Sequence, residues 1–234
     1  MFGIKTAIKN YLTYQKPKKI SNDWQIFQLM QYFQADEHGH RANTQKADLG
    51  YAWLHYAFIR QQKPKNLLCV GSRHGFIPAI MAQACKDNGF GRVDFVDAGF
   101  GDEQPKKNWS GVGFWKKTDP QAYFAKMNLQ NHISTHVMTT QEYAKQNPKK
   151  RYQYIYIDGD HSYEGVKLDY KLFWSKLDAD CLMAFHDVMA QGLLDEGVFG
   201  VWKFYKEIAT KKSITIPLPK DSGLGILQKV RSKK

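Results

Sequence analysis

The residues most able to do chemistry lie in one short stretch, Tyr154 to Gly165, which reads YIYIDGDHSYEG. Its first four residues alternate aromatic and aliphatic side chains, as a buried strand does. Asp158, Asp160 and His161 follow, so carboxylates and an imidazole stand where that strand ends. Ligands bind in the crevice beyond the carboxyl ends of the strands in open α/β sheets. The stretch therefore predicts a functional site, although helix capping by Asp160 or Ser162 would explain part of the cluster.

A second strand end further along the chain carries the same kind of side chain. Residues 181–185 (CLMAF) read as a buried strand, and His186 and Asp187 follow it directly. If this strand lies beside residues 154–157 in a parallel sheet, the two strand ends are roughly 5 Å apart. Acidic groups from two strands are therefore expected to meet at one edge of the sheet.

A glycine turn near the middle of the chain is typical of nucleotide binding. The apolar run Asn66–Val70 is followed by GSRHG and then by an apolar helical face. Gly71 allows a tight turn, and Gly75 allows the backbone to approach a ligand at the helix N-terminus. Asp97 ends the next strand, 22 positions after Gly75. A carboxylate at that place suits the hydroxyls of a ribose.

The apolar pattern also supplies the elements that must position these residues. Strands are expected at residues 66–70, 92–96, 133–138, 154–157, 181–185, 214–216 and 225–227. Helices are expected near residues 23–30, 49–60, 77–85, 121–129, 142–146, 166–177 and 198–208, with a long functional loop at 98–119. The last two strands are too close in sequence for a helical crossover, so they must pair antiparallel or splay.

This pattern predicts an α/β fold with a doubly wound, mostly parallel, seven-stranded sheet, a C-terminal antiparallel hairpin and an N-terminal helical extension. Residues 1–47 are expected to form the basic extension or a lid, and residues 48–234 the main domain. The first 20 residues would either contact an anionic membrane or dock on the domain. His38 and His40 have no partner nearby in sequence, so no metal site is expected there.

Composition indicates a globular chain and excludes several classes. Of its 234 residues 43% are hydrophobic and 14% aromatic, enough for one sizeable core. No apolar run is long enough to cross a membrane, and no signal-peptide pattern opens the chain. Cys69, Cys85 and Cys181 are far apart within apolar segments, which favours reduced core cysteines and a cytoplasmic location.

The net charge of +12 favours an acidic partner, such as nucleic acid, an anionic membrane surface, or an acidic substrate. The lysines and arginines are scattered in short runs, and no nucleic-acid-binding signature accompanies them. A solvated basic surface is therefore favoured over specific nucleic-acid binding.

Taken together, the alternation and the terminal hairpin resemble the class I S-adenosylmethionine-dependent methyltransferase fold. More narrowly, IDGDHSYEGVKLDY, AFHDV and GLGIL resemble small O-methyltransferases related to sugar and macrolide-glycoside O-methyltransferases and to cephalosporin-hydroxylase-like proteins. The resemblance covers about residues 48 to 230. It departs from the usual pattern at Cys69, where many relatives have an acidic residue, and at Arg73, which replaces the middle glycine of the turn.

The resemblance assigns part of the chain to the cofactor, S-adenosylmethionine. The positions concerned are Gly71, Ser72, Gly75, Asp97, Thr140, Gln141 and Asp158. The first three would hold the methionine end of the cofactor, Asp97 would bind its ribose, and Thr140 and Gln141 would lie near its adenine.

In metal-dependent relatives, the positions of Asp158, His186 and Asp187 bind Mg²⁺ beside the substrate oxygen; with a histidine among the ligands, Mn²⁺ is an alternative here. A base at Asp160 or His161 would accept the proton of the substrate. An ordinary imidazole titrates near pH 6.5, which favours His161, whereas burial or a metal-bound alcohol would favour Asp160.

These expectations define three functions. The first is methyl transfer to a hydroxyl of a sugar or another polar small molecule, one that is acidic or glycosylated. The second is nucleic-acid methylation, which would make binding sensitive to salt. The third is a cofactor-binding or scaffold protein without catalysis, in which Asp158, Asp160 and Asp187 could be replaced without loss of function. The oligomeric state does not follow from the sequence.

Overall fold

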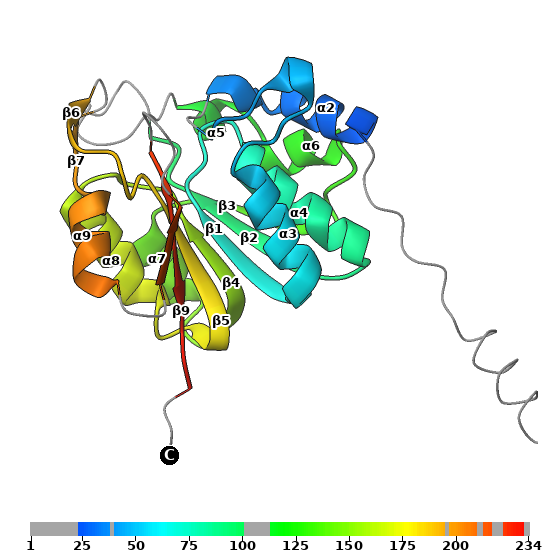
Figure 1. Ribbon diagram of the computed structural model, residues 1–234. Coiled ribbons are helices and arrows are strands. Elements are labelled where there is room, and N and C mark those ends of the chain that lie inside the picture. The colour runs from blue at the N-terminus through cyan, green and yellow to red at the C-terminus, as the bar shows by residue number, and fades with distance from the viewer. Residues whose placement is uncertain are drawn as a thin grey trace, which may run out of the picture.

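A single sheet organises the part of the chain that the computed structural model describes, which is residues 23–37, 40–100, 113–194, 197–209, 213–216 and 222–231. Its strands are β1 (Asn66–Val70), β2 (Arg92–Asp97), β3 (Ile133–Val137), β4 (Tyr152–Ile157), β5 (Leu177–His186), β8 (Ser213–Ile216) and β9 (Leu224–Gln228). They lie in the order β3-β2-β1-β4-β5-β9-β8 (Figure 1).

The strand directions confirm the predicted fold. The first five strands pair in parallel, and β9 pairs antiparallel with both β5 and β8. The terminal strands therefore pair rather than splay, and β9 lies inside the sheet with β8 at its edge. The carboxyl ends of β1, β2 and β4 consequently open toward one side of the molecule.

Helices cover both faces of the sheet (Figure 1). One face carries α2 (Asp23–Tyr32), α3 (Ala52–Gln62) and α4 (Phe76–Asn88). The other carries α7 (Thr140–Gln146), α8 (Tyr163–Phe173) and α9 (Val201–Ile208). The shorter helices are α5 (Phe114–Lys117), α6 (Pro120–Ala125), η1 (Ala35–Glu37) and η2 (Thr44–Lys46).

Side-chain alternation along β4 joins the two hydrophobic cores. Tyr154 and Tyr156 belong to the core under α3 and α4, whereas Ile155 and Ile157 belong to the core under α8 and α9. All four side chains are buried. Because successive strand residues point to opposite faces, one apolar strand fixes both layers of helices. It also fixes the direction in which Asp158 leaves the sheet.

Strand pairing moves two helix boundaries away from the sequence expectation. The helix expected to reach residue 177 ends at Phe173, and Leu177 already pairs with Tyr152 as the start of β5. The helix expected from residue 198 begins at Val201, because the preceding residues form β7 (Gly197–Phe199), which pairs with β6 (Gly192–Leu194). In both places, residues whose apolar spacing also fits a helix pair in a strand instead.

The N-terminal extension is described only from Asp23 onward, so the expected membrane contact of residues 1–20 lies outside the described residues. Within α2, Leu29 and Met30 are buried in the core that α3 and α4 also line. Among the described residues, no helix has the length and apolar character needed to span a bilayer. All three cysteines are free, as expected. The division at residue 47 and the cytoplasmic location stay predictions.

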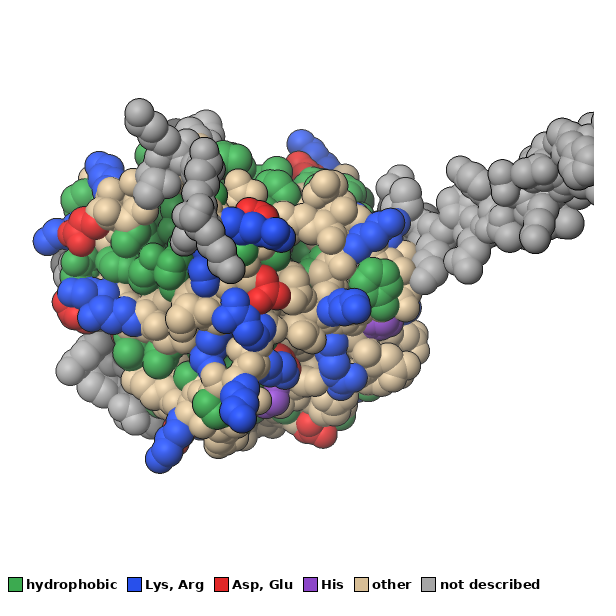
Figure 2. All heavy atoms as spheres, turned by 90° about the horizontal axis from the view of Figure 1, so that it is seen from below, with side chains coloured by type: hydrophobic (Ala, Val, Ile, Leu, Met, Phe, Trp, Pro, Cys, Tyr) green, Lys and Arg blue, Asp and Glu red, His purple; other side chains and the backbone are tan. Residues whose placement is uncertain are grey.

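Basic residues at the amino ends of the strands bind nearby carbonyl groups and carboxylates. Figure 2, seen from below relative to Figure 1, shows many lysine and arginine side chains and few acidic ones. Arg92 donates to the carbonyl oxygen of Ile133, and Arg151 binds Asp178 and the carbonyl oxygen of Leu177. These cations satisfy carbonyl groups at strand ends, on the side away from the carboxyl ends where the predicted site lies.

A buried ion pair anchors β2. Asp94 is 4% exposed, and its carboxylate lies 2.6 Å from Lys150 Nζ and 3.4 Å from His136 Nε2. Burial opposes ionisation of this carboxyl group, but hydrogen bonds from His136 and Lys150 outweigh burial and lower the pKa of Asp94. A lowered pKa stabilises the fold above the ordinary pKa of aspartate, and that stabilisation is lost as the pH falls.

We expect Asp94→Asn to lower the free energy of unfolding by about 1–3 kcal/mol at pH 7, because it leaves Lys150 without its charge partner. The deficit should shrink when urea unfolding is repeated at about pH 3, below the ordinary pKa of aspartate, since the unfolded wild-type chain then binds a proton that folding must release. The control is Asp180→Asn, which alters a half-exposed carboxylate paired with exposed Arg231 and should cost about 0.5 kcal/mol or less. Equal costs for the two variants at pH 7 would contradict this assignment.

Candidate active site

A cavity of about 300 Å³ lies at the carboxyl ends of β1, β2 and β4, with α8 forming one wall. Most residues predicted from the sequence meet here. Those that line the cavity are Gly71, Ser72, Asp97, Thr140, Gln141, Asp158, Asp160 and His161. Gly75, His186 and Asp187 are not among the lining residues.

Gly71 holds the ends of β1 and β4 together. Its φ is +75°, and a Cβ atom added there would lie 2.1 Å from the carbonyl oxygen of Asp158. The amide of Gly71 donates to Val96 O, and the amide of Asp158 donates to Val70 O, each at 2.8 Å. Only glycine permits this approach, which joins the turn to Asp158.

Asp97 lies at the end of β2 and accepts hydrogen bonds from two backbone amides. Ser72 N is 3.1 Å from its Oδ2, and Gly99 N is 2.7 Å from its Oδ1. Burial nevertheless raises the pKa of Asp97 to about 6, and the charge of Asp158 adds to this rise. Each carboxylate oxygen keeps accepting capacity for a further donor, such as a hydroxyl group in the cavity.

Gly75 has a packing role below the turn. It is the N-cap of α4 with φ +86°, and a Cβ atom there would meet Phe124 at 2.9 Å and Trp115 at 3.1 Å. The indole of Trp115 donates to Ser72 O at 2.8 Å. Gly75 was predicted to approach a ligand, but its contact with two aromatic rings is by itself sufficient to require glycine.

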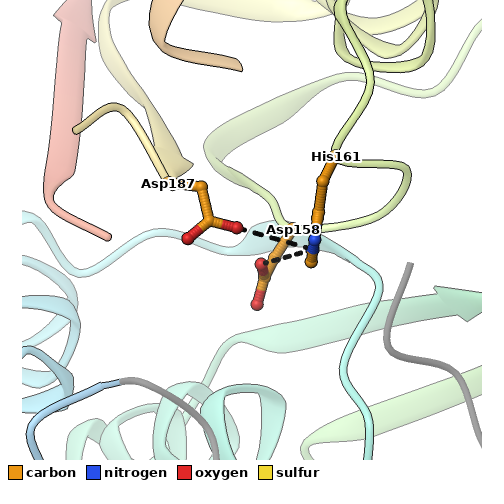
Figure 3. A group of neighbouring side chains, drawn as sticks. All are labelled: Asp158, His161 and Asp187. Carbon is orange, nitrogen blue, oxygen red and sulfur yellow. Dashed lines mark ion pairs between the residues drawn. The ribbon is translucent and has the colours of Figure 1, made fainter. Parts of the chain in front are cut away.

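Beside the cavity, Asp158, His161 and Asp187 form a cluster (Figure 3). His161 Nε2 is 3.8 Å from Asp158 Oδ1 and 3.6 Å from Asp187 Oδ2. These separations are too long for hydrogen bonds. One ligand atom from each residue nevertheless lies within 4.8 Å of the other two. Two carboxylates and an imidazole that face one point fit a divalent cation, and the nitrogen donor fits Mn²⁺ better than Mg²⁺.

His186 orients this cluster. Its Nδ1 is 2.9 Å from Asp158 Oδ1 and 3.4 Å from Asp187 Oδ1. Asp187 has φ +59°, a backbone conformation that few residues other than glycine adopt. From the sequence, His186 is either a third ligand or a neighbour that orients the two aspartates, and its contacts fit the second role. The ligand atoms that lie within 4.8 Å of one another come from Asp158, His161 and Asp187.

Asp160 and His161 are adjacent in sequence and differ in environment. Asp160 is exposed, and its Oδ1 accepts the amide hydrogen of Ser162 at 2.8 Å. Ser162 caps α8 by accepting from Gly165 N. His161 is buried against the ring of Phe199, with 4.7 Å between ring centroids. Helix capping thus accounts for Asp160 and Ser162 but not for His161.

The structure adds residues that sequence reasoning missed. His40 is buried, its ring centroid is 4.5 Å from that of His186, and its Nε2 is 4.0 Å from Asp158 Oδ2. Tyr156 donates from its hydroxyl to Asp158 Oδ2 at 3.2 Å. No sequence signal placed His40 here. For Tyr156, the alternation along β4 does predict the face of the sheet on which its side chain lies.

A third missed residue, Asp169, lies on α8. It lines the cavity together with Gly165 and Leu168, and its side chain is buried. The signal was present in the sequence, because Asp169 lies three positions after Val166 and four before Phe173, on the apolar face of the helix.

A protein-family model described as a methyltransferase domain matches residues 68–188, about half of the chain. An uncharacterized protein of Sinorhizobium fredii is 24% identical over 182 residues, which are 75% of this chain and 19% of that relative. The chain therefore spans about a fifth of the length of this curated relative.

Solved structures share the fold at low sequence identity. The O-methyltransferase from Bacillus cereus in complex with SAH has a TM-score of 0.61 and 16% identity, over 97% of this chain and 100% of that one. The O-methyltransferase TomG from Streptomyces achromogenes, involved in tomaymycin synthesis and solved with SAM, has a TM-score of 0.59 and 12% identity, over 98% and 100%.

A substitution can test whether the close approach of Gly71 to Asp158 requires glycine. We expect Gly71→Ala to destabilise the protein by about 1–3 kcal/mol more than Gly89→Ala, because its methyl group would overlap the β4 backbone. Gly89 is a suitable control, since it has a similar φ of +77° but lies exposed at the end of α4. Urea unfolding measures both costs. A similar loss in the two variants would show that the strand ends adapt without strain.

Proposed function

The chain belongs to the methyltransferase-domain family, and we propose that it is an S-adenosylmethionine-dependent O-methyltransferase acting on a sugar or another polar small molecule. The observation that carries this proposal is the cavity at the carboxyl ends of β1, β2 and β4, with a carboxylate–imidazole cluster beside it. The expected methyltransferase resemblance is confirmed for the family and the fold. Such an enzyme must align a methyl donor with a hydroxyl and remove the hydroxyl's proton.

The cavity suits the methyl donor in size and polarity. Its volume of about 300 Å³ is at the lower end of the usual range for small-molecule sites, roughly 300–1,000 Å³. Asp97 would accept hydrogen bonds from the ribose hydroxyls, and Thr140 and Gln141 would lie near the adenine. The Bacillus and Streptomyces structures are complexes with SAH and SAM, which supports the same cofactor here.

The cluster of Asp158, His161 and Asp187 is the proposed acceptor site. These residues would hold a divalent cation, Mg²⁺ or Mn²⁺, whose positive charge lowers the pKa of a neighbouring hydroxyl. His161 faces both carboxylates. It would act either as a ligand of the cation or as the group that accepts the hydroxyl's proton. Asp160 keeps one carboxylate oxygen bonded to Ser162 N, so we assign it to the turn.

The charge distribution does not favour the nucleic-acid alternative. The described cations at the strand amino ends bind carbonyl groups and carboxylates on the side away from the cavity. Among the described residues that line the cavity, four aspartates outnumber one cation, Arg73. A polar small molecule is therefore the better acceptor, and metabolites with free hydroxyl groups are the class to screen.

Cofactor binding tests this proposal directly. We expect wild type to bind S-adenosylhomocysteine in calorimetric titration, and Asp97→Ala to weaken binding by about 1.5–3 kcal/mol, the range for hydrogen bonds to a charged group. Wild-type affinity should fall as the pH drops through about 6, because the protonated carboxyl group accepts ribose hydroxyls less well. This pH dependence should be absent from Asp97→Ala and unchanged in Asp180→Asn. Absence of binding in wild type would favour the scaffold alternative.

The roles of Asp160 and His161 can be separated by kinetics. With a hydroxyl acceptor found by screening sugars and uronic acids with methyl-labelled donor, single-turnover transfer by His161→Ala should fall by roughly 10²-fold or more. Asp160→Asn should lose less than about tenfold, since an asparagine oxygen can still accept from Ser162 N. Both variants should keep wild-type affinity for S-adenosylhomocysteine, because neither replaces Asp97.

The same pair of variants also tests the cation. If His161 is a ligand, Mn²⁺ should support turnover at least as well as Mg²⁺, and His161→Ala should lose Mn²⁺ binding in titration while Asp160→Asn retains it. Turnover that survives chelator treatment unchanged would reject the cation. A slow Asp160→Asn variant beside a fast His161→Ala variant would reverse the assignment of the two residues.

A further inference from the structure

Asp169 is a carboxylate in a position that packing alone would fill with an apolar side chain. It shares the inner face of α8 with Val166 and Phe173, and it is only 4% exposed. Burying an ionisable group costs free energy unless a partner compensates. Asp169 lies in the part of α8 that forms a wall of the cavity, so a ligand there could donate the hydrogen bond that compensates its burial.

The protein itself gives Asp169 little compensation. In the described part of the chain it forms no ion pair, and the side chain that hydrogen-bonds it is Thr140. Burial raises the pKa of Asp169 to about 7, the bond from Thr140 opposes this rise, and the charge of Asp160 adds to it. Within the described residues, the donor that compensates this carboxyl group is therefore the hydroxyl of Thr140.

The carboxyl group reaches the cavity floor next to β4. A Cβ atom on Gly159 would lie 3.3 Å from Asp169 Oδ2, so the missing side chain of Gly159 leaves the carboxylate accessible from the cavity. Thr140, which begins α7 at the end of β3, touches it from the other side. Asp169 thus lies between Thr140, which follows β3, and Gly159, which follows β4.

The surroundings of Asp169 match a flat heterocycle with one amino edge. Leu168 lines the same wall, and apolar side chains of Ala98, Phe100 and Met138 line other parts of the cavity. Such side chains suit the faces of an aromatic ring, and a carboxylate suits a donor on its edge. Adenine has a single exocyclic amine, and its other edge atoms accept hydrogen bonds or carry none.

We propose that Asp169 is the residue that recognises adenine, its carboxylate accepting a hydrogen bond from the exocyclic amine while Thr140 holds it in place. This assignment rests on the proposed function, since it requires the adenosyl cofactor in the cavity. It makes Asp169 a specificity residue: a purine with a carbonyl oxygen in place of the amine brings an acceptor against a carboxylate.

Two ligands separate this role from a structural one. S-adenosylhomocysteine and S-inosylhomocysteine differ at the purine edge, where the amine of the first is a carbonyl oxygen in the second. We expect the wild-type chain to prefer the adenosyl ligand by at least about tenfold in calorimetric titration, the effect of one hydrogen bond to a charged group. In Asp169→Asn the preference should fall to about threefold or less, because a carboxamide can donate to the carbonyl oxygen.

The control is Glu164→Gln, which neutralises an exposed carboxylate on the same helix and should keep the wild-type preference. If Asp169→Asn weakens both ligands equally and keeps the preference, the residue acts only on the fold and the inference is overturned. If that variant does not fold, the wild-type comparison still decides, since equal affinity for the two ligands is incompatible with recognition of the amine. A wild type that binds neither ligand would instead reject the cofactor itself.

Discussion

The close approach of β1 and β4 at Gly71 is the constraint on which the site depends. The Cα of Gly71 packs against the backbone of Asp158 with no room for a side chain, and the hydrogen bond from Asp158 N to Val70 O joins β4 to β1 beside this contact. The contact thereby brings two structural features together at one cavity. They are the turn that continues into α4 and the carboxylate that follows β4. Any widening of this contact would separate the glycine turn from Asp158, even with every side chain present.

Around this contact the protein concentrates acidic groups that need partners. Asp158 shares its two oxygens among Tyr156, His186 and the more distant imidazoles of His40 and His161. The strand β4 supplies the tyrosine, β5 the histidine at its end, and the segment before α3 supplies His40. Because buried carboxylates are costly without donors, the aromatic and imidazole shell is what keeps the cluster in one geometry.

The sequence predicted the parts of this architecture that follow from periodicity. Alternation along β4 and the glycine turn placed Asp97 and Asp158 at strand ends that line one cavity, and the short terminal loop excluded a parallel crossover between β8 and β9. Boundaries failed at Leu177, where strand pairing and helical spacing compete for the same apolar residue. His40 could not be predicted, because its neighbours come from the ends of β4 and β5, more than a hundred residues away. Asp169 could have been, since a carboxylate on an apolar helical face is visible in the sequence.

The balance of charge in the cavity bears on how the proposed reaction would proceed. Although the whole chain carries a net charge of +12, Asp97, Asp158, Asp160 and Asp169 all line this cavity, where Arg73 offsets one of the four negative charges. A methyl donor of the sulfonium type loses its positive charge on transfer, so it is attracted here more strongly than the product. A unit charge about 6 Å from a carboxylate contributes roughly 3 kcal/mol at an effective dielectric constant near 20. Half of that difference already separates donor from product about tenfold, so the acidic lining both draws in the donor and favours release of the spent cofactor.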